Sequence, residues 1–406
     1  MDDITVRSIE PSELDDFLQV VERAFHGRWQ PDDADPDRLI AEPDRWFVAL
    51  DGDDIVGTAG ACTTELTVPG GILSAPGVTA VGVLPSHRRR GINTMLMGAI
   101  LDQAAERDEA LAYLWASETA IYGRFGYGMA SLCTEIEMAA DRSAFVPGVR
   151  IGGRVRVLPR DVALPFMRPI YDAVAPTRPG MIAVDDRWWK SLWLERKRDE
   201  DQPPFFALHE DDEGSVDGFA VYTVKHEWRH SVPSNELRVR DLVATNPDAT
   251  AALWRFLFDV DLVATVTAED RPVDEELLWL VAEPRRLHAM VIDGLFLRVL
   301  DVERALGGRH YSGNGRLVLE IDDAFRPGTS GRYELAVDGG EGSCRRTDAE
   351  PDLSCNVTTL GAAYLGGSSF RQLERAHQVR ERTPGSLARA DSMFAWDPSP
   401  WFGFVY

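Results

Sequence analysis

Apolar residues change their spacing along the first part of the chain, and these changes predict alternating strands and helices. Residues 4–9 form a short β-type run, and the apolar positions after it recur at the spacing of one helix face. Ser12 is a residue type that caps helices, so we expect a helix from Ser12 to Phe25. The elements expected next are strands at 46–50 and 55–66 around an Asp51-Gly52 turn, a strand at 78–83, a helix from Ile92 and a strand at 111–116.

Clusters of proline and glycine divide the rest of the chain. Pro147-Gly148 and Gly152-Gly153 indicate a boundary near residue 148, and another is expected near Glu283-Pro284. The middle part mixes strands at 219–225 and 237–244 with a helix at 251–258. The elements expected in the last part are a strand at 295–300, a helix capped by Asp301 and ending at Leu306, strands at 316–321, 332–337 and 354–358, and helices at 360–364, 370–377 and 386–394.

The run that begins at Val78 leads into the most informative stretch of the chain. Val78, Val81 and Val83 suit a strand. Pro85 ends it, and three consecutive arginines then precede Gly91 at the start of a helical pattern. This order brings free backbone N–H groups, the positive end of a helix dipole and guanidinium groups together, where phosphate binds readily. The alternative is a solvated basic turn before an amphipathic helix.

Length and charge narrow the class of protein. The 406 residues exceed what one hydrophobic core usually supports, so two or three domains are expected. The chain carries 43 basic and 66 acidic residues, a formal net charge of −23. This balance argues against nucleic acid as a partner, because nucleic-acid binding depends on a cationic surface. It favours cationic ligands through long-range steering, although solubility alone would also explain an acidic surface.

Cysteines and apolar runs bear on the cellular compartment. Cys62, Cys133, Cys344 and Cys355 show no Cys-x-x-Cys spacing, so free buried thiols are expected, with a Cys344–Cys355 disulfide as the alternative. No apolar run approaches the roughly 18 residues of a membrane span. The charged residues among the first ten do not resemble a signal peptide. We therefore expect a cytoplasmic protein without a membrane partner.

The segment His226-Glu227-Trp228-Arg229-His230 matches the His-Glu-x-x-His pattern of zinc proteases. That chemistry requires a helix, which places both imidazoles on one face. Here the pattern follows a β-type run and precedes Pro233, and no third ligand is evident in the sequence. We therefore expect no metal site.

Two segments carry a resemblance to a known enzyme family. Arg88-x-x-Gly91-x-Asn93 is similar to the Arg/Gln-x-x-Gly-x-Gly/Ala signature of the GNAT superfamily of N-acetyltransferases, with Asn93 departing from its last position. Together with Ala116-Ser117-Glu118 and Ile121-Tyr122-Gly123-Arg124-Phe125-Gly126-Tyr127-Gly128, this loop resembles the Eis (enhanced intracellular survival) acetyltransferases. The resemblance implies an α+β fold with tandem GNAT-like domains, which are mixed sheets flanked by helices, and a sterol carrier protein-like α/β domain.

The same resemblance implies a part for each domain. Residues 1–148 would be the GNAT domain that binds acetyl-CoA, residues 149–290 a degenerate GNAT-like domain, and residues 291–406 the sterol carrier protein-like domain. The second domain is not expected to bind the cofactor, because the place of its phosphate loop reads Thr245-Asn246-Pro247-Asp248, without glycine or arginine. The acceptor would lie in an acidic pocket between the first and third domains.

The family motif also implies roles for single residues. Tyr122 would be the general acid, the alternative being an aromatic packing residue. The α-carboxylate of Tyr406, after an apolar tail, would be the general base, the alternative being an aromatic latch. Phe25 and Trp29 would line the acceptor pocket or belong to the core. Contacts to acetyl-CoA would come from Val81, Gly82, Val83, Arg88, Arg89, Arg90, Gly91, Ile92 and Ser117.

The activity implied by this resemblance is transfer of an acetyl group from acetyl-CoA to a primary amine of a cationic acceptor such as an aminoglycoside. Self-association as a homo-hexamer is expected with it. Two alternatives of other classes are a catalytically inactive GNAT-like scaffold and a lipid-binding protein, the latter suggested by the third domain.

Overall fold

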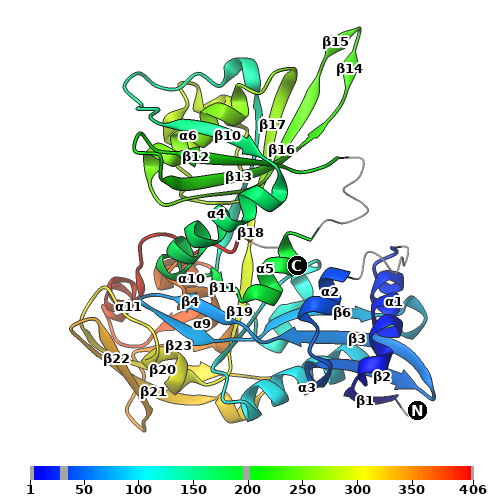
Figure 1. The fold of residues 1–406 in the computed structure, drawn as a ribbon. Coiled ribbons are helices and arrows are strands. Elements are labelled where there is room, and N and C mark those ends of the chain that lie inside the picture. Colours follow the sequence, from blue (N-terminus) through cyan, green and yellow to red (C-terminus); the bar gives the residue numbers. More distant parts are fainter. Residues whose placement is uncertain (1–3, 28–34, 195–201, 404–406) are drawn as a thin grey trace.

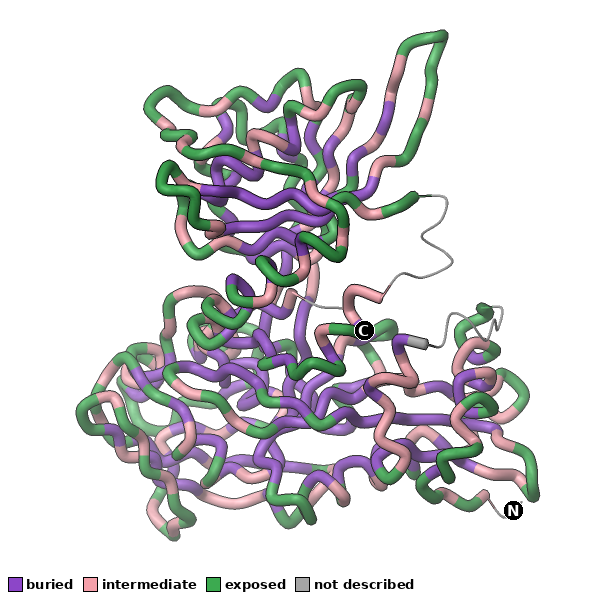
Figure 2. Tube along the Cα trace, in the orientation of Figure 1, coloured by how far each residue is buried: buried purple, intermediate pink, exposed green. Residues whose placement is uncertain are grey.

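Two seven-stranded mixed sheets and one five-stranded sheet form the framework of the protein in the computed structural model, which describes residues 4–27, 35–194 and 202–403. The second seven-stranded sheet forms an upper lobe, and the other two sheets lie side by side in the body beneath it (Figure 1). Buried residues run along the strands of both parts, and exposed residues concentrate in the connections (Figure 2). The core therefore lies between the sheets and their helices.

The first sheet has helices on both faces because successive apolar residues in its strands point to opposite sides. Trp46 and Val48 pack towards α1, whereas Phe47 and Ala49 pack towards α3. The strand order is β1-β2-β3-β6-β7-β19-β8. The bounds are β1 (Ile4–Ser8), β2 (Trp46–Asp51), β3 (Asp54–Cys62), β6 (Gly77–Val83), β7 (Leu111–Trp115), β8 (Gly128–Met129), β19 (Leu295–Val299), α1 (Leu14–Ala24), α2 (Asp35–Ile40) and α3 (Ile92–Glu106).

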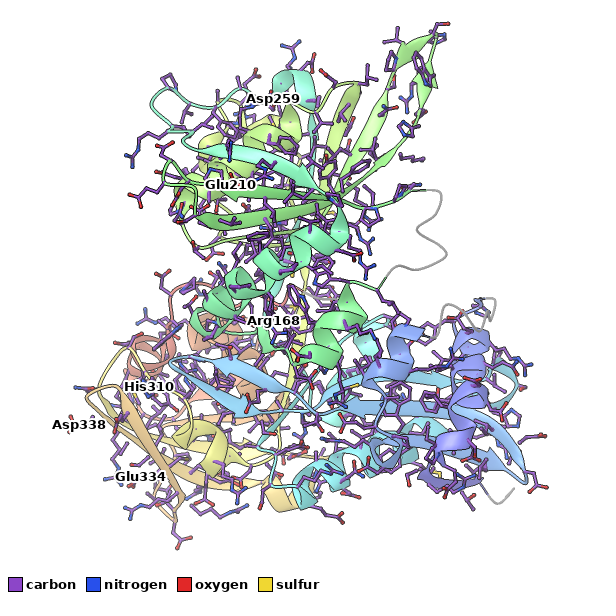
Figure 3. The ribbon with its side chains drawn as sticks, in the orientation of Figure 1. Arg168, Glu210, Asp259, His310, Glu334 and Asp338 are labelled. Carbon is purple, nitrogen blue, oxygen red and sulfur yellow. The ribbon has the colours of Figure 1, made fainter. Side chains whose placement is uncertain are left out.

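The second sheet has the order β10-β12-β13-β16-β17-β9-β18, and a small sheet of β11, β4 and β5 joins the middle of the chain to the first domain. Helix α6 covers one face of the second sheet and α4 the other, where Arg168 lies between the lobe and the body (Figure 3). The bounds are β4 (Glu65–Val68), β5 (Gly71–Ser74), β9 (Leu132–Ala139), β10 (Arg154–Leu158), β11 (Ile182–Ala183), β12 (Phe205–Glu210), β13 (Val216–Lys225), β14 (Trp228–Arg229), β15 (Val232–Pro233), β16 (Asn235–Ala244), β17 (Val263–Pro272), β18 (Met290–Asp293), α4 (Arg160–Val174), α5 (Asp186–Leu192), α6 (Pro247–Phe258) and α7 (Leu277–Leu280).

The five-stranded sheet has the order β22-β21-β20-β23-β24. Its apolar face packs against α9 and α11, while charged residues such as Glu334, which is paired with Arg345 at 2.9 Å, lie on the other face. The bounds are α8 (Val302–Gly307), β20 (Gly315–Asp322), β21 (Gly331–Asp338), β22 (Glu341–Arg346), β23 (Leu353–Asn356), α9 (Val357–Tyr364), α10 (Phe370–Arg375), β24 (Val379–Glu381) and α11 (Ser386–Phe394).

The chain changes sheet at places that differ from the expected domain boundaries. Strand β9 lies ahead of residue 148 but pairs with β17 and β18 of the second sheet. Strand β19, expected to open the last part, pairs with β7 and β8 in the first sheet. Both crossings occur in short extended links, where the Gly294 N–H donates to the Ser131 carbonyl at 3.1 Å. The proline and glycine residues near 148 therefore mark a loop after β9 rather than a change of sheet.

Helix starts show how far local sequence signals hold. Asp301 caps α8 as expected, because its carboxylate accepts the Arg304 N–H at 3.0 Å. The prediction that Ser12 caps the first helix was wrong, since Ser12 lies inside a 3-10 turn before α1. Here the longer Glu13 side chain reaches back and accepts the Glu10 N–H at 2.8 Å.

Two expected strands are shorter than predicted. The run at 55–66 contains a break, and β3 and β4 are separate strands on either side of it. The run at 354–358 ends at Asn356, whose side chain accepts the Thr359 N–H at 2.8 Å and begins α9 three residues before the expected start. In both cases the β-type sequence run continues beyond the last residue that is paired in the sheet.

The cysteines and the His-Glu-x-x-His segment lie as follows. All four cysteines are free thiols, so Cys344 and Cys355 do not form a disulfide; Cys344 is partly exposed and the others are buried. The histidine pattern lies on the β14–β15 hairpin rather than on a helix. No helix among the described residues is both long and apolar enough to cross a membrane.

Candidate active site

An opening in the first sheet begins where β6 and β7 part. Their parallel ladder consists of two pairs, Gly77 with Tyr113 and Val78 with Leu114. Beyond it Ala80 has a left-handed φ of 53°, and the β3–β6 register shifts at that point. Such a bulge bends a strand away from its neighbour. The backbone of β6 after the bulge, which includes Val81, Gly82 and Val83, therefore lies along an opening at the carboxyl ends of parallel strands, where ligands commonly bind.

The basic loop closes one end of this opening and carries features of an anion site. Gly91 has a φ of 81°, precedes α3, and would have no atom within 4 Å of an added Cβ. The first turn of α3, which begins at Ile92, contains no acidic residue. Arg88 and Arg89 are exposed, and neither side chain makes a hydrogen bond or ion pair with a described residue. Unpaired N–H groups and two unpaired guanidinium groups therefore meet here.

Arg90 is placed differently from its two neighbours. Its Nη1 lies 2.9 Å from Oδ2 of Asp51, at the end of β2, and Nε2 of His87 lies 3.2 Å from the same oxygen. Hydrogen bonding from Arg90 holds the pKa of the Asp51 carboxyl below its ordinary value. Arg90 therefore links the loop to the β2–β3 turn, and its guanidinium is engaged within the protein.

Tyr122 follows the neighbouring strand β7, on the other side of the opening from the basic loop after β6. It belongs to the 3-10 segment η5 (Thr119–Phe125), which follows β7 and the exposed Ser117. Its side chain is 6% exposed, and its ring packs edge-on against Tyr127 at 6.1 Å. Burial, and to a smaller extent the charge of Glu118, raises the pKa of Tyr122 to about 12. The phenol therefore keeps its proton over the physiological pH range and can act as a proton donor.

The described part of the carboxy-terminal tail is buried against β7 at Trp401 and Phe402. Phe402 is fully buried, with its ring 5.5 Å from that of Tyr113 and 6.2 Å from that of Trp115 on β7. The Trp401 N–H donates to the Pro179 carbonyl at 2.8 Å. These contacts bring the chain to the end of β7 as far as residue 403. Tyr406 lies outside the described residues.

Phe25 lies at the end of α1, beside Gly82 of β6. Its side chain is 51% exposed, and an added Cβ at Gly82 would be 3.8 Å from its ring. An aromatic ring this exposed is available to a ligand beside β6 and is not part of the core. Trp29 lies outside the described residues.

Two acidic residues near the tail were missed in the sequence. Burial raises the pKa of Asp270 to about 6 and that of Asp241 to about 7. The Asp270 carbonyl accepts the Trp401 indole N–H at 2.5 Å, and Oδ2 of Asp241 has no hydrogen-bond partner among the described residues. Arg271 lies between Asp241 and the tail, since it lowers the pKa of Asp241 and its guanidinium lies over the Trp401 ring. The available signal was an acid at a position that shares the buried alternation of Leu237 and Val239, as Asp241 does.

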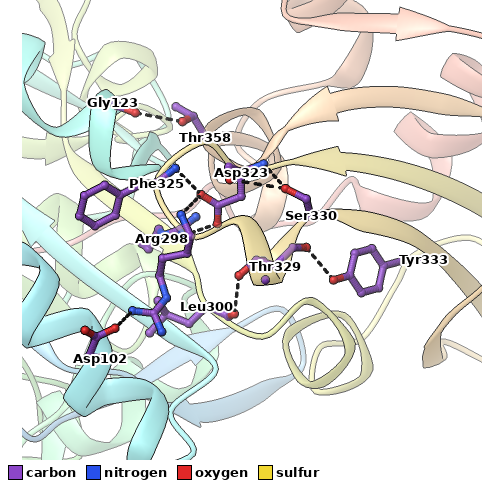
Figure 4. Close-up of polar contacts among 12 residues, drawn as sticks. Asp102, Gly123, Arg298, Leu300, Asp323, Phe325, Thr329, Ser330, Tyr333 and Thr358 are labelled. Carbon is purple, nitrogen blue, oxygen red and sulfur yellow. Dashed lines mark hydrogen bonds and ion pairs between the residues drawn. The ribbon is translucent and has the colours of Figure 1, made fainter.

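Glycines of the segment around Tyr122 are explained by contacts with the third domain. A Cβ on Gly126 would overlap the Arg298 guanidinium, and a Cβ on Gly128 would overlap the backbone of Thr358 in α9. The Thr358 hydroxyl donates to the Gly123 carbonyl at 3.3 Å (Figure 4). The end of η5 and the residues that follow it are therefore packed against β19 and against α9 of the third domain. Arg298 was also missed, although it is the one charged residue in the apolar run 295–300.

Comparison with known families matches this architecture. Residues 5–130 match a model described as an acetyltransferase (GNAT) domain, residues 180–299 match a second model of the same description, and residues 302–403 match a sterol carrier protein domain. An N-acetyltransferase of Streptomyces avermitilis, itself named uncharacterized, is 41% identical over 369 residues, 90% of each chain. N-acetyltransferase Eis of Mycobacterium tuberculosis is 32% identical over 384 residues, also 90% of each chain. The chain belongs to the Eis family of GNAT N-acetyltransferases.

A solved structure agrees with the membership. The crystal structure of Eis1 from Mycobacterium abscessus superposes with a TM-score of 0.85 and 31% identity over 100% of both chains. The predicted family, the fold class of two GNAT domains followed by a sterol carrier protein-like domain, and the enzyme class of acetyltransferase are confirmed. GNAT enzymes use acetyl-CoA. The opened edge of β6 and the basic loop at residues 88–91, called the anion loop below, fit that co-substrate.

Substitution of two glycines tests the contact between the η5–β8 segment and the third domain. Gly128→Ala is expected to lower the free energy of unfolding by about 1–3 kcal/mol, because the new methyl group would overlap the α9 backbone. Gly123→Ala is the matched control, since an added Cβ there meets nothing within 4 Å. Urea unfolding followed by tryptophan fluorescence measures both, and equal stability of the two variants would contradict this packing.

Proposed function

We propose that the protein transfers the acetyl group of acetyl-CoA to a primary amine of a cationic acceptor, with aminoglycosides as the representative class. The single observation that carries the proposal is the parting of β6 and β7, where the basic loop follows β6 and the segment with the Tyr122 phenol follows β7. The identity of the acceptor class is extended from the family and is supported by the formal net charge of −23.

The residues that would hold acetyl-CoA divide by the part they contact. Backbone groups of Val81, Gly82 and Val83 would bind the pantetheine arm along the opened edge of β6. The N–H groups of the first α3 turn, at Gly91 and Ile92, would bind the pyrophosphate together with Arg88 and Arg89. Ser117 would contact the arm from the end of β7. Arg90 would support the loop through Asp51 rather than touch phosphate.

The chemistry requires two proton transfers. As the amine nitrogen bonds to the thioester carbonyl carbon, it gives a proton to a base, and the carbon–sulfur bond then breaks. We assign Tyr122 as the group that donates a proton to the departing sulfur, since its raised pKa keeps the phenol protonated. We assign the base to the α-carboxylate of Tyr406. The burial of Trp401 and Phe402 supports this assignment, because the described chain ends at residue 403, next to β7.

The second domain is proposed to bind no acetyl-CoA. At the start of α6, the Asn246 side chain accepts the Ala249 N–H at 2.9 Å and donates to Asp217 at 2.7 Å. Asp248 adds a negative charge in the first turn. The place that would receive a phosphate is therefore capped from within and carries the wrong charge.

The remaining expectations differ in their support. The lipid-binding alternative receives no support from the third domain, because a charged side chain, Arg309, is buried in its interior. The Arg309 guanidinium lies 4.7 Å from the centre of the Tyr311 ring and donates to the Phe394 carbonyl at 3.1 Å. The homo-hexamer expected from the family resemblance and the acidic acceptor pocket between the first and third domains stay predictions.

The loop assignment is tested by removing its two unpaired charges. The double variant Arg88→Ala/Arg89→Ala should raise the KM for acetyl-CoA on the order of 10- to 100-fold, because two charge-assisted contacts to phosphate are lost. The kcat at saturating acetyl-CoA should change little. Steady-state assays of thiol release measure both, with the exposed and remote Arg286→Ala as control. An unchanged KM would remove the loop from the binding site.

The general-acid assignment is tested with Tyr122→Phe, which should lower kcat by about 100- to 1000-fold and leave the KM for acetyl-CoA unchanged. The matched control is Tyr222→Phe, another buried tyrosine with a raised pKa. Because the protonated phenol is the active form, activity that depends on it is lost only as the pH rises through its pKa of about 12. A wild-type loss of kcat below pH 10 that disappears in Tyr122→Phe would contradict the assignment.

The base assignment is tested by extending the chain. Adding three alanines after Tyr406 should lower kcat at least about 100-fold, because the carboxylate moves away from its position while the tail can still pack. The unfolding temperature should stay within a degree or so of wild type. The control carries the same three alanines at the amino terminus. Full activity of the carboxy-terminally extended protein would exclude the α-carboxylate as the base.

A further inference from the structure

A buried arginine lies next to the segment that carries Tyr122. Arg298 is fully buried on β19, opposite Ala112 of β7 in the ladder. Because side chains alternate along a strand, Arg298 points to the same face as Phe296, which belongs to the apolar cluster that contains Tyr122. A charge in this position is costly unless it is paired, so its partner matters.

The partner comes from the third domain. Nη2 of Arg298 donates to Oδ2 of Asp323, whose side chain is also buried (Figure 4). The other carboxylate oxygen of Asp323 accepts the N–H groups of Phe325 at 3.2 Å and Arg326 at 3.0 Å, so the acid is held by its own loop. Nε and Nη1 of Arg298 have no hydrogen-bond partner among the described residues. The ion pair of Arg298 is therefore with Asp323.

The guanidinium group also touches the turn that ends η5. Gly126 has a φ of 85°, and the space of its missing side chain is occupied by Nη1 of Arg298. The Gly126 N–H donates to the Gly123 carbonyl at 3.0 Å, and the Tyr127 N–H donates to the Tyr122 carbonyl at 3.3 Å. Arg298 therefore packs against the residue that closes the turn on which Tyr122 stands.

The loop that holds Asp323 makes two further contacts with the first domain. Phe325 packs edge-on against Phe125 of η5 with ring centroids 5.1 Å apart. Arg326 forms an ion pair with Asp102 of α3, the helix whose start lies in the anion loop. One loop of the third domain thus contacts both the turn of Tyr122 and the helix proposed to hold the pyrophosphate.

We propose that Arg298 and Asp323 are positioning residues for acetyl transfer: their buried ion pair holds the η5 turn against the docked third domain, and so places the Tyr122 phenol relative to the thioester sulfur. The inference rests on the general-acid role proposed for Tyr122. It gives the third domain a part in the chemistry that does not depend on the carboxy-terminal tail. A displacement of the phenol by about 1 Å is enough to cost a large factor in rate.

Four variants of the full-length protein test the proposal, each assayed as kcat and as KM for acetyl-CoA per folded protein. Arg298→Met and Asp323→Asn should each lower kcat about 10- to 100-fold and leave KM within about twofold of wild type. Arg298→Lys keeps the charge near Asp323 and should recover a kcat within about fivefold of wild type. The control is Arg45→Met, which breaks the equally buried Arg45–Glu109 pair far from η5 and should lower the unfolding temperature without lowering kcat.

The outcomes separate this inference from the proposed function. If Tyr122→Phe loses kcat while Arg298→Met and Asp323→Asn keep it, the positioning role is overturned and the function stands. A loss of kcat in Arg45→Met as large as in Arg298→Met would reduce the effect to general stability and also overturn it. If Tyr122→Phe keeps its kcat, the role of Tyr122 fails and this inference fails with it. Should Arg298→Met not fold, Asp323→Asn and Arg298→Lys decide by the same criteria.

Discussion

The bulge at Ala80 is the constraint on which the site depends. A left-handed residue in the middle of β6 breaks the register with β3, and the Thr58 hydroxyl stabilises that conformation by donating to the Ala80 carbonyl at 2.9 Å. With β6 bent, its ladder to β7 ends at Val78. Without this parting, the strand edge proposed to bind the pantetheine arm would be hydrogen-bonded to β7. The anion loop and the Tyr122 phenol would then face no common space.

The rest of the molecule closes around this opening from outside the first domain. Strand β19 comes from a later part of the chain and completes the first sheet. Helix α9 packs against backbone at Gly128, where no side chain would fit. The tail returns over β7 through Phe402. In the proposed account, a domain that resembles a lipid carrier acts as structural support for acetyl transfer, and the charged side chain of Arg309 is buried in its interior.

Local patterns predicted most of the elements and the chemistry of the loop, but they could not predict contacts between distant parts of the chain. The β-runs, the Asp301 cap and the burial of the tail at Phe402 follow from spacing and residue type. Arg90 pairs with Asp51, whereas Arg88 and Arg89 do not. This difference depends on where the β2–β3 turn lies in space. The crossing before β9 occurs at Ala130-Ser131, which contains no proline or glycine, and the crossing before β19 occurs at the single residue Gly294, where a turn signal does not reveal a change of sheet.

Hydrogen–deuterium exchange with and without coenzyme A tests the central claim most directly. The account predicts slower exchange of the amides of Val81 and Val83, and of the first turn of α3 from Ile92 to Thr94, because these N–H groups would bind the arm and the pyrophosphate. The start of α6 in the second domain should be unaffected, since the Asn246 side chain already accepts the Ala249 N–H there. Protection at the start of α6 instead, or none along β6 and α3 at saturating coenzyme A, would contradict the account.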